Sequence, residues 1–139
     1  MALELDRSKR HDVADVLVRY ATGIDRRDWT LFRTCFMGDC DVDYGAIGHW
    51  RSVDEITEWM EKTHAPFGHT LHRITNAAVD VDGDTACARS YVDAVLMDLE
   101  NRKGIRAVGF YEDELVATGD GWRIARRRFT LVHQEILGS

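Results

Sequence analysis

The stretch TLHRITNAAVDVDGDTACARSYVDA, residues 70–94, alternates between apolar and polar side chains on both sides of a turn signal, DGD at 82–84. Period-two alternation interrupted by such a turn predicts two strands joined as a hairpin. Two more turn signals follow, ENRKG at 100–104 and TGDG at 118–121. Short connections make consecutive strands antiparallel neighbours. The C-terminal half is therefore predicted to be a four-stranded meander.

The N-terminal half has the three- and four-residue apolar spacing of helices. This spacing predicts a first helix whose apolar stripe covers 13–24, and further helices over 28–36 and 52–62, the last opening with the capping box SVDE. Residues 39–46 alternate like a strand between the second and third helix. Helices segregated to one face of an antiparallel sheet define an α+β domain. We therefore predict one α+β domain over residues 1–139, a cone of curved antiparallel sheet closed by three helices around a pocket.

The composition argues against several functions. The chain has a net charge of −6, and its one basic cluster, residues 126–128, cannot face one way in a strand, so nucleic-acid binding is not expected. No apolar run approaches the roughly 18 residues of a membrane span, and the charged N-terminus has no apolar signal core. Three widely spaced cysteines suit reduced thiols in the cytoplasm. Cys35 and Cys87 are expected to be apolar packing.

The sequence contains none of the common cofactor motifs. Nothing resembles a P-loop, a GxGxxG turn after a strand, or GxSxG, so we expect no cofactor. His64, His69 and His72 lie within nine positions, but a strand would turn His69 and His72 to opposite faces, and no helix-face pair is formed. We therefore expect no metal. His64 and His69 bracket the turn APFG and are predicted to lie on a loop at the pocket rim or in solvent.

Four segments, in this order along the chain, resemble the SnoaL-like branch of the nuclear-transport-factor-2-like superfamily. They are VLVRYATGIDRRDWTLFRTCFMGDCDVDYG, GHWRSVDEITEWM, LHRITNAAVDVDGDTACARSYVDA and GFYEDELVATGDGWRIARRRF. The likeness spans roughly residues 8–136 and is closest to the group of scytalone dehydratase, a bile-acid dehydratase and a hexachlorocyclohexane dehydrochlorinase. The superfamily also contains polyketide cyclases and members without chemistry, so the resemblance implies a fold more strongly than a reaction.

Enzymes of that group pair an aspartate on a helix with a histidine on a strand inside the cone. The matching positions here are Asp25, in YATGID, and His72, in LHRITN. The resemblance to the bile-acid dehydratase also implies Tyr20 and Tyr44 as catalytic groups and Asp93 as a second acidic residue that binds substrate. The dehydrochlorinase differs at Tyr20, where it has a basic residue.

The chemistry of each residue leaves a functional and a structural role open. Arg73 prefers solvent, which turns its neighbour His72 toward the pocket, either as a base or as a core histidine. Asp25 lies at the edge of the apolar helix stripe and is either the partner of His72 or a surface carboxylate paired with an arginine. Tyr20 and Tyr44 either polarise a carbonyl group or pack with tethered hydroxyls.

Asp93 and Arg128 are the two predicted substrate-binding residues. Asp93 shares a strand face with Arg89, so a salt bridge is the alternative role for its carboxylate. Arg128 is predicted to share a face with Trp122 and Ile124, where it would bind a carboxylate or phosphate of a ligand, or pair with an acidic side chain.

These features predict a cofactor-independent lyase, a dehydratase in the first place, or an isomerase. It would act on a small hydrophobic cyclic substrate with a His–Asp general base. Two alternatives stay open: a non-catalytic domain that binds a ligand or stabilises an oligomer, and a polyketide cyclase. A homodimer or homotrimer is expected, because such sheets often expose one broad face to a second subunit.

Overall fold

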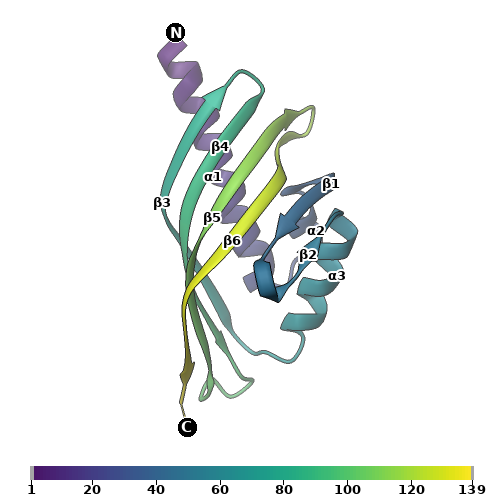
Figure 1. Cartoon of the computed structure of the whole chain (residues 1–139), viewed down its shortest axis with the longest axis vertical. Coiled ribbons are helices and arrows are strands. Elements are labelled where there is room, and N and C mark those ends of the chain that lie inside the picture. The colour runs from purple at the N-terminus through teal and green to yellow at the C-terminus, as the bar shows by residue number, and fades with distance from the viewer. Residues whose placement is uncertain (1, 139) are drawn as a thin grey trace.

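The computed structural model describes residues 2–138, which form three α-helices, one short 3₁₀ turn and six strands (Figure 1). The strands that follow the last helix are the longest, at 13 to 17 residues each. The elements are α1 (Ala2–Asp25), α2 (Trp29–Arg33), β1 (Phe36–Asp43), η1 (Gly45–Ile47), β2 (His49–Trp50), α3 (Val53–His64), β3 (Thr70–Asp82), β4 (Thr85–Met97), β5 (Gly104–Thr118) and β6 (Gly121–Leu137).

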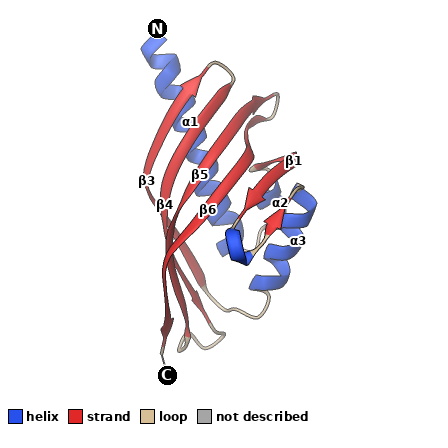
Figure 2. Cartoon of the chain, in the orientation of Figure 1, coloured by secondary structure: helices blue, strands red, loops and turns tan. Residues whose placement is uncertain are grey.

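The strands form one curved, unclosed sheet in the order β2-β1-β6-β5-β4-β3 (Figure 2). β3 to β6 make the antiparallel meander that the turn signals predict. β1 pairs with β6 in parallel, so the sheet is mixed, while the predicted α+β class is confirmed. The turn signals gave no indication of this pairing, because α3 and four strands separate β1 from β6 in the chain and no hairpin joins them.

α1 crosses one face of the long strands and supplies much of the core (Figure 1). We call this face of the sheet the inner face, and the opposite one the outer face. The predicted stripe of α1 is buried as expected, with no side chain more than 1% exposed: Val13, Val16, Leu17, Tyr20 and Ile24. Burying a side chain of this size contributes roughly 1.5–3 kcal/mol. This stripe fixes the rotation of α1 and hence the direction of Asp25, its last residue.

α3 begins at its predicted cap and ends later than predicted. The Ser52 hydroxyl accepts a hydrogen bond from the backbone N–H of Glu55 at 3.1 Å. The Glu55 carboxylate accepts from the backbone N–H of Arg51 at 2.8 Å, one residue before the position that a capping box predicts. The helix continues to His64 instead of ending near residue 62. This extra half-turn determines where the His64 side chain points.

The far ends of β4, β5 and β6 extend past the helices, at the bottom of Figure 1. On the inner face, their register places apolar residues side by side across the three strands. Leu131 and Ile136 in this area are 39% and 84% exposed. We call this surface the apolar shelf. Its apolar members are Leu96, Ile105, Ala107, Leu131 and Ile136, and the polar Gln134 lies among them, opposite Ala107. The inner face is thus covered at one end of the sheet and open at the other.

The three cysteines are free thiols, and two of them, Cys35 and Cys40, are buried. Cys87 is exposed, so the prediction that it packs in an apolar environment is wrong. The reason is the strand period: Ala86 and Ala88 are buried on the inner face of β4, which turns Cys87 outward. Over residues 2–138, none of the helices combines the length and the apolar character that a membrane crossing requires.

Candidate active site

Asp25 and His72 form a hydrogen-bonded pair where the end of α1 meets the start of β3. Oδ1 of Asp25 lies 2.7 Å from Nδ1 of His72, and Oδ2 accepts the backbone N–H of His72 at 2.8 Å. The Thr70 hydroxyl donates a third hydrogen bond to Oδ1 at 3.0 Å. Arg27 donates in turn to the Thr70 hydroxyl at 2.9 Å. Three donors from β3 therefore hold the carboxylate in one orientation.

These contacts assign the tautomer of His72. An ionised carboxylate can only accept hydrogen bonds, so Nδ1 of His72 carries the proton. Nε2 then keeps a free lone pair, which is the state required of a general base. The side chains of His72 and Asp25 are 9% and 18% exposed. The pair is sheltered but is not sealed from solvent.

The apolar shelf adjoins His72 on its open side. In the sheet register, Ala94 lies opposite His72, and Ala107 lies opposite Ala94. The next inner row toward the uncovered end contains Leu96 and Ile105. The apolar shelf therefore begins beside His72 on the inner face.

His64 is a second histidine beside His72, and the prediction that it lies on a loop or in solvent is wrong. It is the last residue of α3, is 4% exposed, and its ring centroid is 5.9 Å from that of His72. Nδ1 of His64 lies 2.8 Å from the carbonyl oxygen of Met60, one helical turn earlier. Burial lowers the pKa of His64 to about 4, against the hydrogen bond to Met60 that raises it. His69, by contrast, is exposed as predicted.

Tyr20 and Tyr44 are brought together, deeper in the core than His72. Their hydroxyl oxygens are 2.5 Å apart and buried. The Tyr20 ring also packs edge-on against Tyr111, with ring centroids 5.7 Å apart. Burial raises the pKa of Tyr20 well above its usual value, and neighbouring tyrosines raise it further. The two hydroxyls therefore share one hydrogen bond, which leaves the second proton of the pair for another acceptor.

This tyrosine pair and the His72–Asp25 pair are separate groups. In the register, β4 presents Ala94 opposite His72 and Ser90 opposite Tyr111. Four residues of strand span about 13 Å. The four predicted catalytic residues thus occupy two places on the inner face, one at its open end and one in the closed core.

Arg127 lies beside the tyrosines and escaped the sequence analysis. Its guanidinium carbon lies 4.2 Å from the ring centre of Tyr20 and 3.9 Å from that of Tyr111. Two hydrogen bonds of 2.7 and 2.9 Å tie Arg127 to the carboxylate of Asp113, and neither side chain is exposed. Its Nη1 atom has no hydrogen-bond partner among the described residues. The core thus holds a buried ion pair whose guanidinium lies against the rings of Tyr20 and Tyr111.

Arg128 points away from this site, contrary to the predicted face. The register of β5 and β6 shifts between Leu115 opposite Ile124 and Glu114 opposite Arg126. The residue between them, Ala125, is an extra residue of a β-bulge, and a bulge exchanges the faces beyond it. Arg127 therefore turns inward, and Arg128 is exposed on the outer face.

Asp93 also lies on the outer face and is not brought together with His72. Its carboxylate receives two hydrogen bonds from Arg106, at 3.0 and 2.9 Å, and lies 3.1 Å from Arg73. Asp93 stands opposite Arg73 in the register, one residue out of phase with His72. Asp93 therefore makes the contacts of a salt-bridge partner, which was the alternative to its predicted role in substrate binding.

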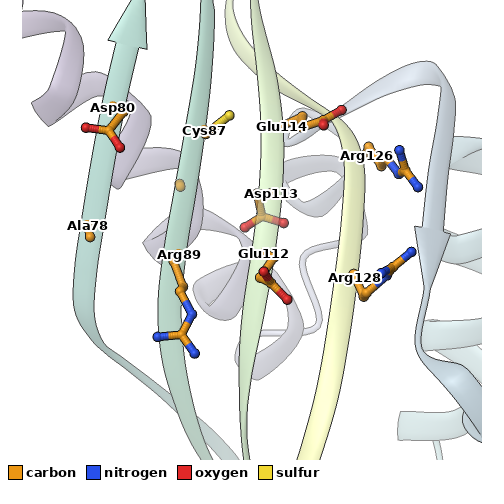
Figure 3. Close-up of a pocket in the computed structure, with 10 residues that line it drawn as sticks. Ala78, Asp80, Cys87, Arg89, Glu112, Asp113, Glu114, Arg126 and Arg128 are labelled. Atoms are coloured by element: carbon orange, nitrogen blue, oxygen red, sulfur yellow. The ribbon is translucent and has the colours of Figure 1, made fainter.

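The outer face has a hollow of about 550 Å³ (Figure 3). A smaller hollow of about 270 Å³ lies beside Trp50 and Trp59. Neither is lined by His72 or Asp25. The larger one is lined chiefly by charged side chains of both signs: Asp80, Arg89, Glu112, Glu114, Arg126 and Arg128. Arg128 thus belongs to a mixed-charge surface instead of the enclosed core.

Comparisons with known proteins agree with this architecture. The model of the SnoaL-like domain matches residues 6–128. An uncharacterised protein of Mycobacterium tuberculosis is 32% identical over 135 residues, which cover 94% of this chain and 90% of the relative. Among solved structures, a provisionally named scytalone dehydratase from Novosphingobium aromaticivorans has a TM-score of 0.88 at 21% identity, covering 96% of this chain and 90% of the other. A type 2 hexachlorocyclohexane dehydrochlorinase has a TM-score of 0.85 at 18% identity, covering 98% and 94%.

Proposed function

The chain belongs to the SnoaL-like family, within the nuclear-transport-factor-2-like fold, and we propose that it is a cofactor-independent lyase or isomerase with His72 as general base. The observation that supports this most strongly is the 2.7 Å hydrogen bond from Nδ1 of His72 to Asp25, which leaves Nε2 free. We propose an elimination as the reaction, because the structurally similar proteins include one named as a dehydratase and one named as a dehydrochlorinase.

In this proposal Nε2 of His72 removes a proton from a carbon next to a carbonyl or to the carbon that bears the leaving group. The C–H electron pair becomes a carbon–carbon double bond, and the leaving group departs with its own bonding pair. Asp25 stabilises the imidazolium that forms, as an orienting carboxylate does in hydrolase triads. General base catalysis of this kind contributes roughly 10²–10⁴-fold to the rate.

The substrate in this proposal is a small hydrophobic ring system. The apolar shelf provides the surface on which it rests, beside His72. The catalytic roles predicted for Tyr20 and Tyr44 are not part of this proposal, because their hydroxyls lie in the closed core, about 13 Å along the sheet from His72.

Exchange of the carbon-bound α-protons of 2-tetralone in heavy water tests proton abstraction without a leaving group. Nuclear magnetic resonance follows the loss of the α-proton signal with and without protein. The wild-type chain is expected to accelerate exchange, and His72→Gln and Asp25→Asn to reduce that acceleration at least tenfold and up to about 10⁴-fold. The matched control is Arg73→Gln, next to His72 but on the outer face. Equal acceleration by wild type and His72→Gln would refute the base.

A second candidate function is a binding or oligomer-stabilising domain without chemistry. The exposed apolar shelf favours it, since side chains such as Ile136, at 84% exposed, are normally covered in an assembly or by a ligand. We propose that the chain associates as a dimer or trimer through this end of the sheet. Light scattering of the wild type and of Ile136→Lys tests the association. A monomeric wild type would contradict it.

A further inference from the structure

His64 presents a buried hydrogen-bond acceptor that no part of the proposed base mechanism uses. Its Nδ1 lies 2.8 Å from the carbonyl oxygen of Met60. A carbonyl can only accept, so Nδ1 carries the proton and Nε2 carries a lone pair. The described residues offer no donor to Nε2, although His64 is only 4% exposed. A buried acceptor without a donor is destabilising unless something supplies one.

The surroundings of His64 narrow what that donor is. Arg27 is a cation whose charge lowers the pKa of His64, but its guanidinium donates to the carbonyl oxygens of Ile24 and Gly68 and to the hydroxyl of Thr70. The Trp29 and Phe67 rings flank His64, with centroids 6.3 and 6.2 Å from that of His64. The fourth neighbour is the His72 ring, at 5.9 Å and inclined by 45°. None of these neighbours donates to Nε2 in the structure, and Nε2 has almost no accessible surface, so a donor from outside the protein reaches it only when the surrounding rings move aside.

We propose that Nε2 of His64 accepts a hydrogen bond from a hydroxyl group of the substrate, beside the carbon from which His72 removes a proton. This inference rests on the proposed function for the position of the substrate, and it defines the substrate class more narrowly. The substrate is a cyclic molecule that carries a hydroxyl near its acidic C–H bond. A halogenated hydrocarbon offers no such donor and would leave Nε2 dry and unpartnered.

Other roles for His64 explain less. A structural histidine would have both ring nitrogens satisfied, and here only Nδ1 is. A metal site would need further ligands, and within residues 2–138 no three histidine, cysteine or acidic side chains are grouped to hold one. A second general base is disfavoured because burial lowers the pKa of His64 to about 4, which makes it a weak base near neutral pH. His64 as a neutral hydrogen-bond acceptor at Nε2 agrees with the single satisfied ring nitrogen, with the lack of grouped metal ligands among the described residues and with the lowered pKa.

Selectivity follows from the same argument. A site built to receive a hydroxyl discriminates against an analogue that lacks it, because the buried protein group is left without a partner. For one neutral hydrogen bond we expect a preference of roughly tenfold to a hundredfold. This preference is a property of binding, so it is measurable without turnover.

The test compares two ligands of the same ring skeleton, 2-tetralol, which bears a hydroxyl, and 2-chlorotetralin, which does not. Titration calorimetry gives their dissociation constants for wild type, His64→Leu and His64→Gln. The wild type is expected to bind the alcohol at least tenfold more tightly. His64→Leu should lose the preference, and His64→Gln should retain part of it, because the amide oxygen is an acceptor. Thermal unfolding checks that each variant is folded.

A second measurement on the wild type does not depend on any variant. The ¹⁵N resonance of Nε2 of His64 is expected to shift with 2-tetralol and to stay in place with 2-chlorotetralin. Three results would overturn the proposal: an unchanged preference in His64→Leu, the same Nε2 shift with both ligands, or no binding of 2-tetralol. The two proposals can fail separately. If His72→Gln exchanges the 2-tetralone protons as fast as wild type does, while the preference for 2-tetralol still depends on His64, only the role of His72 as base is refuted.

Discussion

Arg127 and Asp113 form a bidentate ion pair, with Nε–Oδ1 and Nη2–Oδ2 distances of 2.7 and 2.9 Å, and both side chains are completely buried. The Tyr20 and Tyr111 rings cover the guanidinium. The arrangement places the paired charges of Arg127 and Asp113 against the faces of these two rings, in a region from which water is excluded. An ion pair in such a place is expensive to break from one side, because the remaining charge has no solvent.

Removal of one partner is therefore expected to be strongly destabilising. Arg127→Met or Asp113→Leu alone should lower the free energy of unfolding by about 3–5 kcal/mol, measured by urea denaturation. The double variant should recover much of this loss, because no uncompensated charge stays in the core. Arg128→Met is the matched control on the neighbouring, exposed residue and should change stability by less than about 0.5 kcal/mol. Equal effects of Arg127→Met and Arg128→Met would contradict the inward position of Arg127.

The hydroxyl pair of Tyr20 and Tyr44 makes a separate prediction. Tyr20→Phe removes one hydroxyl and leaves the other buried without its partner, so it should lower the free energy of unfolding by about 1–3 kcal/mol. Adding Tyr44→Phe to this variant should cost only a fraction of that amount more. In the double variant both hydroxyls are gone, so none stays buried without a partner. Additive losses in this double-mutant cycle would show that the two hydroxyls are not coupled.

His64 makes the stability of the chain depend on pH. Its pKa is lowered by burial to about 4 in the folded chain, whereas an unfolded histidine titrates near 6.5. The unfolded chain therefore binds the proton first as pH falls. The contribution of neutral His64 is fully present above pH 6.5 and is lost progressively toward pH 4, by up to roughly 3 kcal/mol.

The check is a comparison of unfolding free energies for wild type and His64→Leu at pH 7, 6, 5 and about 4. The difference between the two chains should shift in favour of His64→Leu as the pH falls through this range. A difference that is constant with pH would mean that the His64 ring is not held neutral in the folded chain.

The periodicity of the sequence predicted the parts of the fold that regular elements determine. The α1 stripe and the four-strand meander were confirmed, because burial of one face leaves its period in the sequence. The pair of Asp25 and His72 was predicted from resemblance, and the structure brings the two side chains together at 2.7 Å. Their roles in a reaction stay a prediction.

The misplaced residues have identifiable physical causes. Arg128 was expected to face inward because strict alternation was assumed, and the bulge at Ala125 leaves no clear signature in ARRRF. His64 was assigned to a loop because the end of a helix is set by local geometry that varies by a residue or two. Asp113 was overlooked, although the alternation of YEDEL places it between the buried residues Tyr111 and Leu115 on one face. A charge in that phase was a signal that could have been used.

The tautomer of His72 tests the central claim most directly. Long-range ¹H–¹⁵N correlation spectra of the imidazole should show Nδ1 protonated and Nε2 bare at neutral pH, because Asp25 accepts from Nδ1. Asp25→Asn should weaken or reverse this preference, since the amide can present a donor to the same nitrogen. If the wild-type spectrum shows the proton on Nε2 instead, His72 offers no lone pair to a substrate, and the proposed base is wrong.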